Sequence, residues 1–109
     1  MRGYIDLIIL RILCDGDSYG YAISKKVTDI SENSYTMKET TLYSAFSRLE
    51  KLGYLHSYPG SFSGGRERTY YALTEEGLQY YSHKCDEWVA TQELISKFIK
   101  VKENDNGRN

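Results

Sequence analysis

The chain has 109 residues, of which 40% are hydrophobic and 27% are charged, and its formal net charge is −1. This length predicts one small domain, and the near-neutral charge speaks against non-specific coating of nucleic acid. No apolar run is long enough to cross a membrane, and the apolar segment 5–13 lacks the flanks of a signal peptide. We therefore expect a cytoplasmic protein.

Residues 4–14 carry apolar side chains at helical spacing, in two stripes rather than one. The first stripe consists of Ile5, Ile8, Ile9 and Ile12, and the second of Leu7, Leu10 and Cys14. A helix in a small monomer needs only one apolar stripe. We therefore expect another surface to cover the second stripe, which is a first indication of a dimer.

Two further helices are predicted after the break at residues 15–18. The helix over 19–31 has Asp or Ser available as its N-terminal cap, and the helix over 39–52 ends at Gly53, a residue suited to the left-handed C-terminal position. Their inner faces are predicted to be Tyr19, Ile23, Val27 and Ile30 in the first, and Leu42, Ala45, Phe46 and Leu49 in the second.

A β-hairpin is predicted next. Residues 55–58 are β-prone, residues 59–65 form a Gly-rich loop, and residues 66–73 alternate as a strand does. Alternation would place Arg66, Arg68 and Tyr70 on one side of that strand.

A long helix, capped by Thr74, is predicted to extend to about residue 101. One stripe of this helix follows the a/d spacing of a coiled coil, which requires a partner stripe. Its residues are Leu78, Tyr81, Cys85, Trp88, Gln92, Ile95 and Ile99. The polar tail 102–109 is expected to fray.

This order of elements predicts an α+β, mainly α fold. We expect a winged helix-turn-helix over residues 1–73, with three helices and a two-stranded wing, and a dimerisation helix over 74–101 in the same compact unit. Residues 38–68 hold five basic and three acidic side chains, a balance of +2. Recognition helices present short polar and cationic side chains to base edges in the major groove. The third helix offers such side chains at Thr40, Thr41, Ser44 and Arg48, and the wing offers Arg66 and Arg68 to phosphates or a minor groove.

The pattern alone also fits less specific interpretations. A polar helix face is commonly just solvated, and alternating arginines often protect a sheet edge. A winged helix that binds another protein is the alternative function. No nucleophile–base pair or phosphate-binding loop suggests an enzyme. His83 and Cys85 would point to different sides of a helix, so no metal site and no cofactor are expected.

The strings TTLYSAFSRLEKLGYL and GGRERTYYALTEEG, together with DGDSYGYAI at 15–23, resemble the PadR family of bacterial transcriptional regulators. The resemblance covers about residues 3–100, and the short last helix is similar to a compact subgroup that includes multidrug-responsive repressors. It implies a homodimer in which the last helix packs on the first helix and on its mate. It also implies repression at a pseudo-palindromic DNA operator and release by an effector.

Residue roles follow from the resemblance and the pattern together. The resemblance implies that Tyr43, Arg48, Arg66 and Arg68 contact DNA. The pattern adds Thr40, Thr41 and Ser44, with Lys38 as a phosphate contact. The expected dimer interface consists of Ile5, Ile8, Leu78, Tyr81, Cys85, Trp88, Ile95 and Ile99.

Trp88 matches the position where compact relatives stack an indole on planar aromatic drugs at the dimer centre. The resemblance and the surrounding positions give a candidate ligand site of Trp88, Leu7, Leu10, Arg11, Cys85 and Gln92. Two alternatives stay open at this point. Trp88 can instead fill the dimer core, and Cys85 can instead serve a redox-responsive regulator that has no small-molecule ligand.

Overall fold

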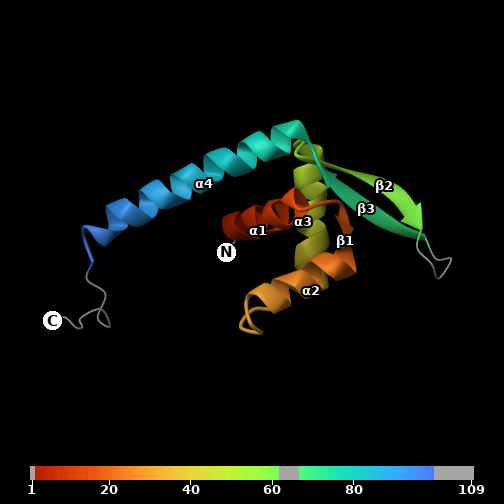
Figure 1. Ribbon diagram of the computed structural model, residues 1–109, viewed down its shortest axis with the longest axis horizontal. Coiled ribbons are helices and arrows are strands. Elements are labelled where there is room, and N and C mark those ends of the chain that lie inside the picture. Colours follow the sequence, from red (N-terminus) through yellow and green to blue (C-terminus); the bar gives the residue numbers. More distant parts are fainter. Residues whose placement is uncertain (1, 62–66, 100–109) are drawn as a thin grey trace.

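The computed structural model describes residues 2–61 and 67–99 (Figure 1). Its helices are α1 (Arg2–Cys14), α2 (Gly20–Ile30), α3 (Glu39–Lys51) and α4 (Glu75–Ser96). Its strands are β1 (Ser18–Tyr19), β2 (Leu55–Ser61) and β3 (Glu67–Leu73), which form an antiparallel sheet in the order β1-β3-β2. Helices α1 to α3 cluster at the centre, while the β2–β3 hairpin and α4 extend in opposite directions. None of the helices in these ranges is both long and apolar enough to cross a membrane.

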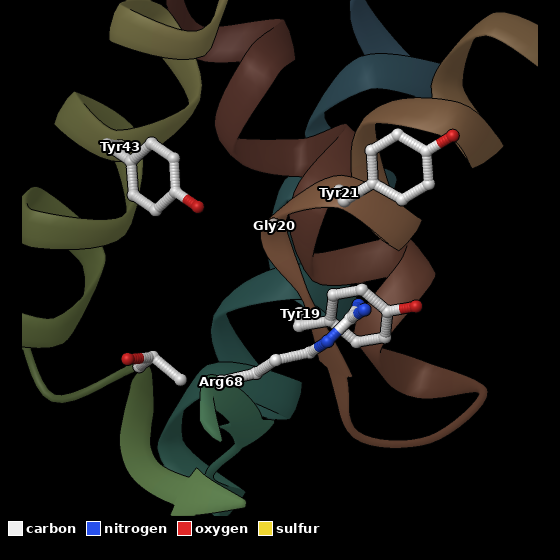
Figure 2. A pocket seen from close by; sticks show the side chains of 6 residues that line it. Tyr19, Gly20, Tyr21, Tyr43 and Arg68 are labelled. Atoms are coloured by element: carbon white, nitrogen blue, oxygen red, sulfur yellow. The ribbon is translucent and has the colours of Figure 1, made fainter. Parts of the chain in front are cut away.

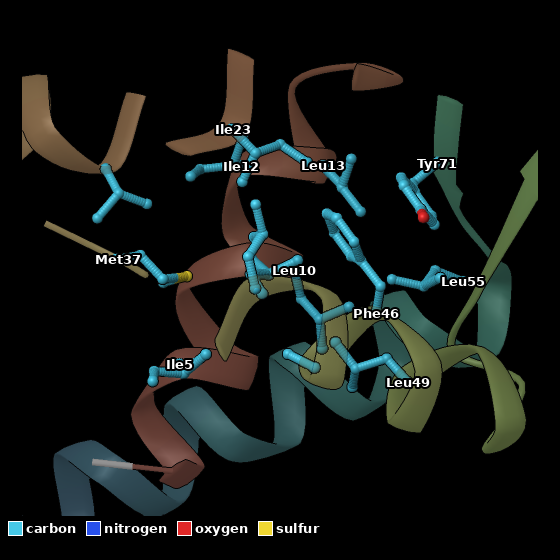
Figure 3. Packing of buried hydrophobic residues seen from close by; sticks show 14 residues of the cluster. Ile5, Leu10, Ile12, Leu13, Ile23, Met37, Phe46, Leu49, Leu55 and Tyr71 are labelled. Carbon is cyan, nitrogen blue, oxygen red and sulfur yellow. The ribbon is translucent and has the colours of Figure 1, made fainter. Parts of the chain in front are cut away.

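The hydrophobic core lies where α1 meets α2, α3 and the base of the sheet (Figure 3). The apolar stripe predicted for α3 is confirmed, because all four of its residues are buried. Phe46 of this stripe stacks on Tyr71 of β3 with ring centroids 3.8 Å apart. This contact joins the third helix to the sheet and so fixes the base of the wing.

The two stripes of α1 divide differently from the prediction. Leu10, assigned to the second stripe, is 0% exposed, and Ile5 is 7% exposed. Ile8 and Leu7 are only half-buried. The reason is that α1 contacts α2, α3, α4 and β3 of its own chain, so several elements surround it. Leu10 of the second stripe is therefore covered within one chain, while Leu7 and Cys14 remain half-buried.

The start of α2 also differs from the prediction. Its N-cap is Tyr19, which makes no side-chain capping bond, and Ser18 and Tyr19 instead pair with Tyr71 and Tyr70 as a third strand. At the other end of α2, Ile30 is exposed rather than facing the core. A two-residue strand is too short to produce a periodic signal, so only its partner β3 defines it.

The wing is longer than predicted, because β2 continues through three residues that were assigned to the loop. Pro59 lies opposite Thr69, and Ser61 lies opposite Glu67. Since β2 is an edge strand, it tolerates a proline that lacks the N–H donor. The other predicted loop residues, 62–65, and Arg66 lie outside the described residues.

The junction from α3 to the hairpin agrees with the sequence. Gly53 has the left-handed φ of 84° predicted for it. The N–H groups of Gly53 and Tyr54 bond to the carbonyls of Glu50 and Leu49 at 3.0 and 2.9 Å, which satisfies the last turn of α3.

The start of α4 also agrees with the sequence. Thr74 caps the helix, because its hydroxyl oxygen accepts a 2.9 Å bond from the Gly77 N–H. The helix ends at Ser96 rather than near residue 101, and the tail predicted over 102–109 lies outside the described residues.

Candidate nucleic-acid interface

The exposed face of α3 carries short polar side chains. Thr40, Tyr43 and Ser44 are exposed on the side opposite the buried stripe, and Thr41 is half-buried. Lys38, also exposed, is the N-cap of the helix. Ser47 is exposed as well. The N-terminal half of α3 thus presents hydroxyl groups in the pattern expected of a recognition helix.

A hollow of about 400 Å³ separates this face from the wing (Figure 2). Its lining comes from the β1–α2 junction, α3 and β3. The lining residues are Tyr19, Gly20, Tyr21, Tyr43, Arg68 and Thr69. Sequence reasoning found Tyr43 and Arg68 but missed the other four residues. Three of these four, Tyr19, Gly20 and Tyr21, lie in the DSYGYAI segment, which the sequence analysis used for the second helix and for the family resemblance.

The Arg68 guanidinium lies over the ring of Tyr19, with its central carbon 4.1 Å from the ring centroid (Figure 2). Such a cation–π contact orients the guanidinium while leaving its positive charge in place. Tyr19 belongs to an aromatic row across the sheet, because Tyr70 lies opposite both Tyr19 and Tyr58. Successive ring centroids in this row are 5.4 and 5.8 Å apart. The row therefore gives Arg68 a rigid support.

A hydrogen bond anchors the outer end of the row. The Tyr58 hydroxyl donates to Asp17 Oδ2 at 2.5 Å, which ties β2 to the segment before β1. This bond is the main reason that the pKa of the Tyr58 phenol is raised. The wing is thus joined to the body of the domain through side chains as well as through β3.

Tyr43 reaches the hollow by crossing the start of α2. A Cβ atom at Gly20 would lie 2.3 Å from the Tyr43 Oη, so only glycine allows the ring to lie there undisturbed. The ring also meets Phe46 edge-on, with centroids 5.4 Å apart. These two contacts set the position of the Tyr43 hydroxyl between α2 and α3.

Arg48 lies toward the C-terminal end of α3, where it is half-buried. Its Nε donates to Asp6 Oδ2 at 3.3 Å, and its Nη2 donates to Asp6 Oδ1. The hydrogen bond to Asp6 is the main reason that the pKa of the Arg48 guanidinium is raised. The sequence grouped Arg48 with the DNA-facing residues, whereas the structure gives it a partner on α1. A second hollow of about 330 Å³ adjoins the pair and is lined by Ile5, Thr40, Thr41, Ser44 and Arg48.

A third hollow, of about 220 Å³, lies between α1 and α4 on the other side of the molecule. Trp88 meets Tyr4 edge-on there, with ring centroids 5.3 Å apart. The lining residues are Tyr4, Leu7, Tyr80, Lys84, Glu87, Trp88 and Thr91. Of the residues predicted for a ligand site, this hollow contains Trp88 and Leu7. Tyr4 and Tyr80 had not been predicted.

The other predicted ligand residues lie elsewhere. Leu10 is in the core, Arg11 bonds to Asp15 at 3.0 Å, and Gln92 is exposed on α4. Cys85 is half-buried, and its side chain contributes, after burial, to the raised pKa of the Tyr81 phenol. Burial raises the pKa of the other thiol, Cys14, which lowers its thiolate content and hence its reactivity. No group of side chains that could hold a metal ion occurs within the described ranges.

Large hydrophobic side chains are exposed along α4 and the residues after it. The large hydrophobic side chains exposed there are Leu78, Trp88, Val89, Leu94, Ile95, Phe98 and Ile99. Of the residues predicted for the dimer interface, four are in this set, and Ile8, Tyr81 and Cys85 are half-buried. Ile5 is 7% exposed and belongs to the core of the single chain.

The fold, together with the polar face of α3 and the Arg68 side chain on the wing, defines a winged-helix protein. The chain belongs to the transcriptional regulator PadR-like family, whose model matches residues 9–83. It is a DNA-binding transcriptional regulator and not an enzyme, which confirms the class that the sequence predicted.

Two solved structures agree with this assignment, and a curated protein is similar to this chain over most of its length. A transcriptional regulator from Clostridium thermocellum is 55% identical, with a TM-score of 0.83, over 91% of this chain and 93% of that chain. A PadR family regulator from Clostridium difficile R20291 is 38% identical, with a TM-score of 0.78, over 89% of this chain and 99% of that chain. The uncharacterized protein X of Lysinibacillus sphaericus is 41% identical over 92% of both chains.

Proposed function

We propose that this chain is a homodimeric repressor that binds a pseudo-palindromic operator. The observation that carries the proposal is the juxtaposition of the hydroxyl-rich face of α3 with the Arg68 hollow of the wing. Together they form one surface that can take a groove and the phosphates beside it. A domain that docked on another protein would not need a cationic notch next to an exposed polar helix.

In this proposal the N-terminal half of α3 enters the major groove. Thr40 and Ser44 lie one helical turn apart and face the base edges, while Lys38 is placed for the phosphate at the groove rim. Tyr43 and Arg68 meet a phosphate at the hollow between α3 and the wing. Thr41 is half-buried and therefore contributes less to the contact with DNA.

Two copies are required for a palindromic site. The apolar surface of α4 described above is too extensive to remain solvated in a small monomer, and a second copy with the same surface would bury it. A two-fold dimer presents α3 twice, once to each half of the operator. The half-sites that such dimers bind lie about one DNA turn, roughly 34 Å, apart. The dimer therefore sets the spacing of the operator halves.

We also propose that a ligand releases the operator, and this part of the proposal rests on the Trp88 hollow. The hollow in one chain is only about 220 Å³, smaller than a site that encloses a drug-sized molecule. A second copy packed on α4 would add its own indole and enlarge the site. A planar aromatic ligand between the two indoles would then quench Trp88 fluorescence, whereas a flat titration across diverse planar compounds would favour core packing.

Operator binding tests the main proposal. Fluorescence anisotropy against the DNA upstream of the gene, measured from low to high salt, should give tight binding for the wild type. Arg68→Ala should flatten the slope of log K against log salt by about 0.9, because one phosphate contact is lost. Ser44→Ala should weaken binding with the slope unchanged.

Lys97→Ala is the matched control, because this exposed lysine follows the end of α4 that is far from the proposed DNA interface. It should leave both the affinity and the slope unchanged. If the wild type binds its upstream DNA no better than random DNA, the operator assignment is wrong and the protein-docking alternative takes its place.

A further inference from the structure

The ion pair of Asp6 and Arg48 joins α1 to α3 across 42 positions of the sequence. Asp6 is 8% exposed and is the charged side chain found in the core of the described chain. Both of its carboxylate oxygens accept a bond from the same guanidinium. Bidentate pairs of this kind are directional, so they fix an angle between two elements as well as a distance.

The pair holds the C-terminal half of α3, whereas the proposed base contacts lie in the N-terminal half. Arg48 is eight residues after Thr40, which is about 12 Å along a helix. Other contacts hold α3 elsewhere, since Ser57 of β2 donates to Glu50 at 2.8 Å and Tyr43 packs over Gly20. The Asp6 pair adds a polar tie from α3 to α1.

The same turn of α1 also faces α4. Tyr4 and Leu7 line the hollow that contains Trp88, and Asp6 lies between them in sequence. One turn of α1 therefore contacts α4, the proposed dimerisation helix, with two side chains and α3, the recognition helix, with a third. The apolar contacts between α1 and α3 resist separation, but they do not fix the rotation of one helix against the other.

We propose that Arg48 is a positioning residue and not a DNA contact, and that its pair with Asp6 sets the angle of the recognition helix relative to α1 and α4. This inference rests on the proposed function, because it assigns a role within operator binding. It places Asp6, which the sequence did not single out, among the residues that determine operator affinity.

The two roles for Arg48 predict opposite effects of Asp6→Asn. If Arg48 positions α3, Asp6→Asn and Arg48→Gln should weaken operator binding to a similar degree, between about 3-fold and 30-fold. The double variant should then be no weaker than either single variant, because both changes remove the same contact. All three variants should keep the salt slope of the wild type, since no phosphate contact is lost.

If Arg48 instead contacts a phosphate, Asp6→Asn should free the guanidinium and remove a nearby negative charge. Binding would then be unchanged or tighter, while Arg48→Gln would lower the salt slope by about 0.9. Either result overturns the proposal. Arg48→Lys sharpens the comparison, because it keeps the charge but loses the two-pronged geometry. It should weaken binding if Arg48 positions the helix.

Hydrogen exchange provides a readout that needs no DNA. Amide groups of residues 44–51 should exchange faster in Asp6→Asn and in Arg48→Gln than in the wild type, by a similar factor in both variants. Unchanged exchange in α3 would overturn the positioning role, whether or not the wild type binds an operator. If the wild type fails to bind an operator while α3 exchanges faster in both variants, the proposed function is overturned. The role of the Asp6–Arg48 pair in holding α3 is then still supported.

Discussion

The hydroxyl of Thr74 donates a 2.7 Å hydrogen bond to the carbonyl of Gly53, so the cap of α4 is bonded to the residue that ends the turn after α3. The same oxygen accepts from the Gly77 N–H at 2.9 Å. One side chain thus joins the end of the recognition helix to the start of the helix that we assign to dimerisation. The angle between these two helices depends on this junction.

Thr74→Val should destabilise the chain, because it removes both hydrogen bonds while keeping the shape of the side chain. We expect the free energy of unfolding to fall by about 1–2 kcal/mol, measured by urea unfolding at a fixed protein concentration. Thr74→Ser keeps the hydroxyl and should lie within a few tenths of a kcal/mol of the wild type. A Thr74→Val variant as stable as Thr74→Ser would show that the cap contributes nothing.

Gly77→Ala should also be destabilising, for a steric reason. The added Cβ would lie 2.0 Å from the Tyr54 carbonyl oxygen and 2.8 Å from Leu73 Cδ1. Because the first of these atoms is backbone, the start of α4 would have to move away, at a cost of about 1–3 kcal/mol. Ser82→Ala, at an exposed position of the same helix, should change stability by less than about 0.5 kcal/mol. Equal unfolding midpoints for the two variants would contradict this close packing.

Alkaline pH should weaken the fold through Tyr81. Burial and a hydrogen bond with Cys85 raise the pKa of its phenol from 10.0 to about 12. Between these values the folded chain keeps a proton that the unfolded chain has lost, so the associated stability is complete below pH 10 and disappears as the pH rises toward 12. Thermal unfolding across this range should show a shallower decline for Tyr81→Phe. The exposed Tyr21→Phe should follow the wild type, and a Tyr81→Phe profile that also does so would contradict the assignment.

Ile95→Glu should convert the dimer to a monomer. A carboxylate among the exposed apolar side chains of α4 would have to be desolvated without a partner when two copies pack together. Sedimentation equilibrium at micromolar concentration should give a dimer for the wild type and a monomer for the variant. Gln79→Glu adds the same charge at an exposed position near the start of α4 and should remain dimeric. A monomeric wild type would rule out the proposed assembly.

Tyr19→Leu should weaken operator binding without altering its salt dependence, because it removes the ring under Arg68 and leaves the positive charge. A loss of about 2-fold to 5-fold corresponds to the strength of an exposed cation–π contact. Tyr19→Phe keeps the ring and should bind as the wild type does. The role of the aromatic row would be refuted if Tyr19→Leu and Tyr19→Phe bound operator equally well.

Periodicity and local capping chemistry were sufficient to predict several elements. The buried stripe of α3, the left-handed Gly53 and the Thr74 cap were all predicted, because each depends on residues within a few positions of one another. The helix-helix-helix-hairpin-helix order and the family strings likewise predicted the winged-helix fold. These features are local, so the linear sequence contains the information that specifies them.

Tertiary structure decided what the side chains at those positions contact. Leu10 is enclosed by the core, β1 exists only because β3 pairs with it, and Arg48 has Asp6 of α1 as its partner. The hollow at Arg68 likewise requires three separate segments to meet. Contacts between residues tens of positions apart leave no periodic trace in the sequence, since spacing determines the face of an element but not what packs against it.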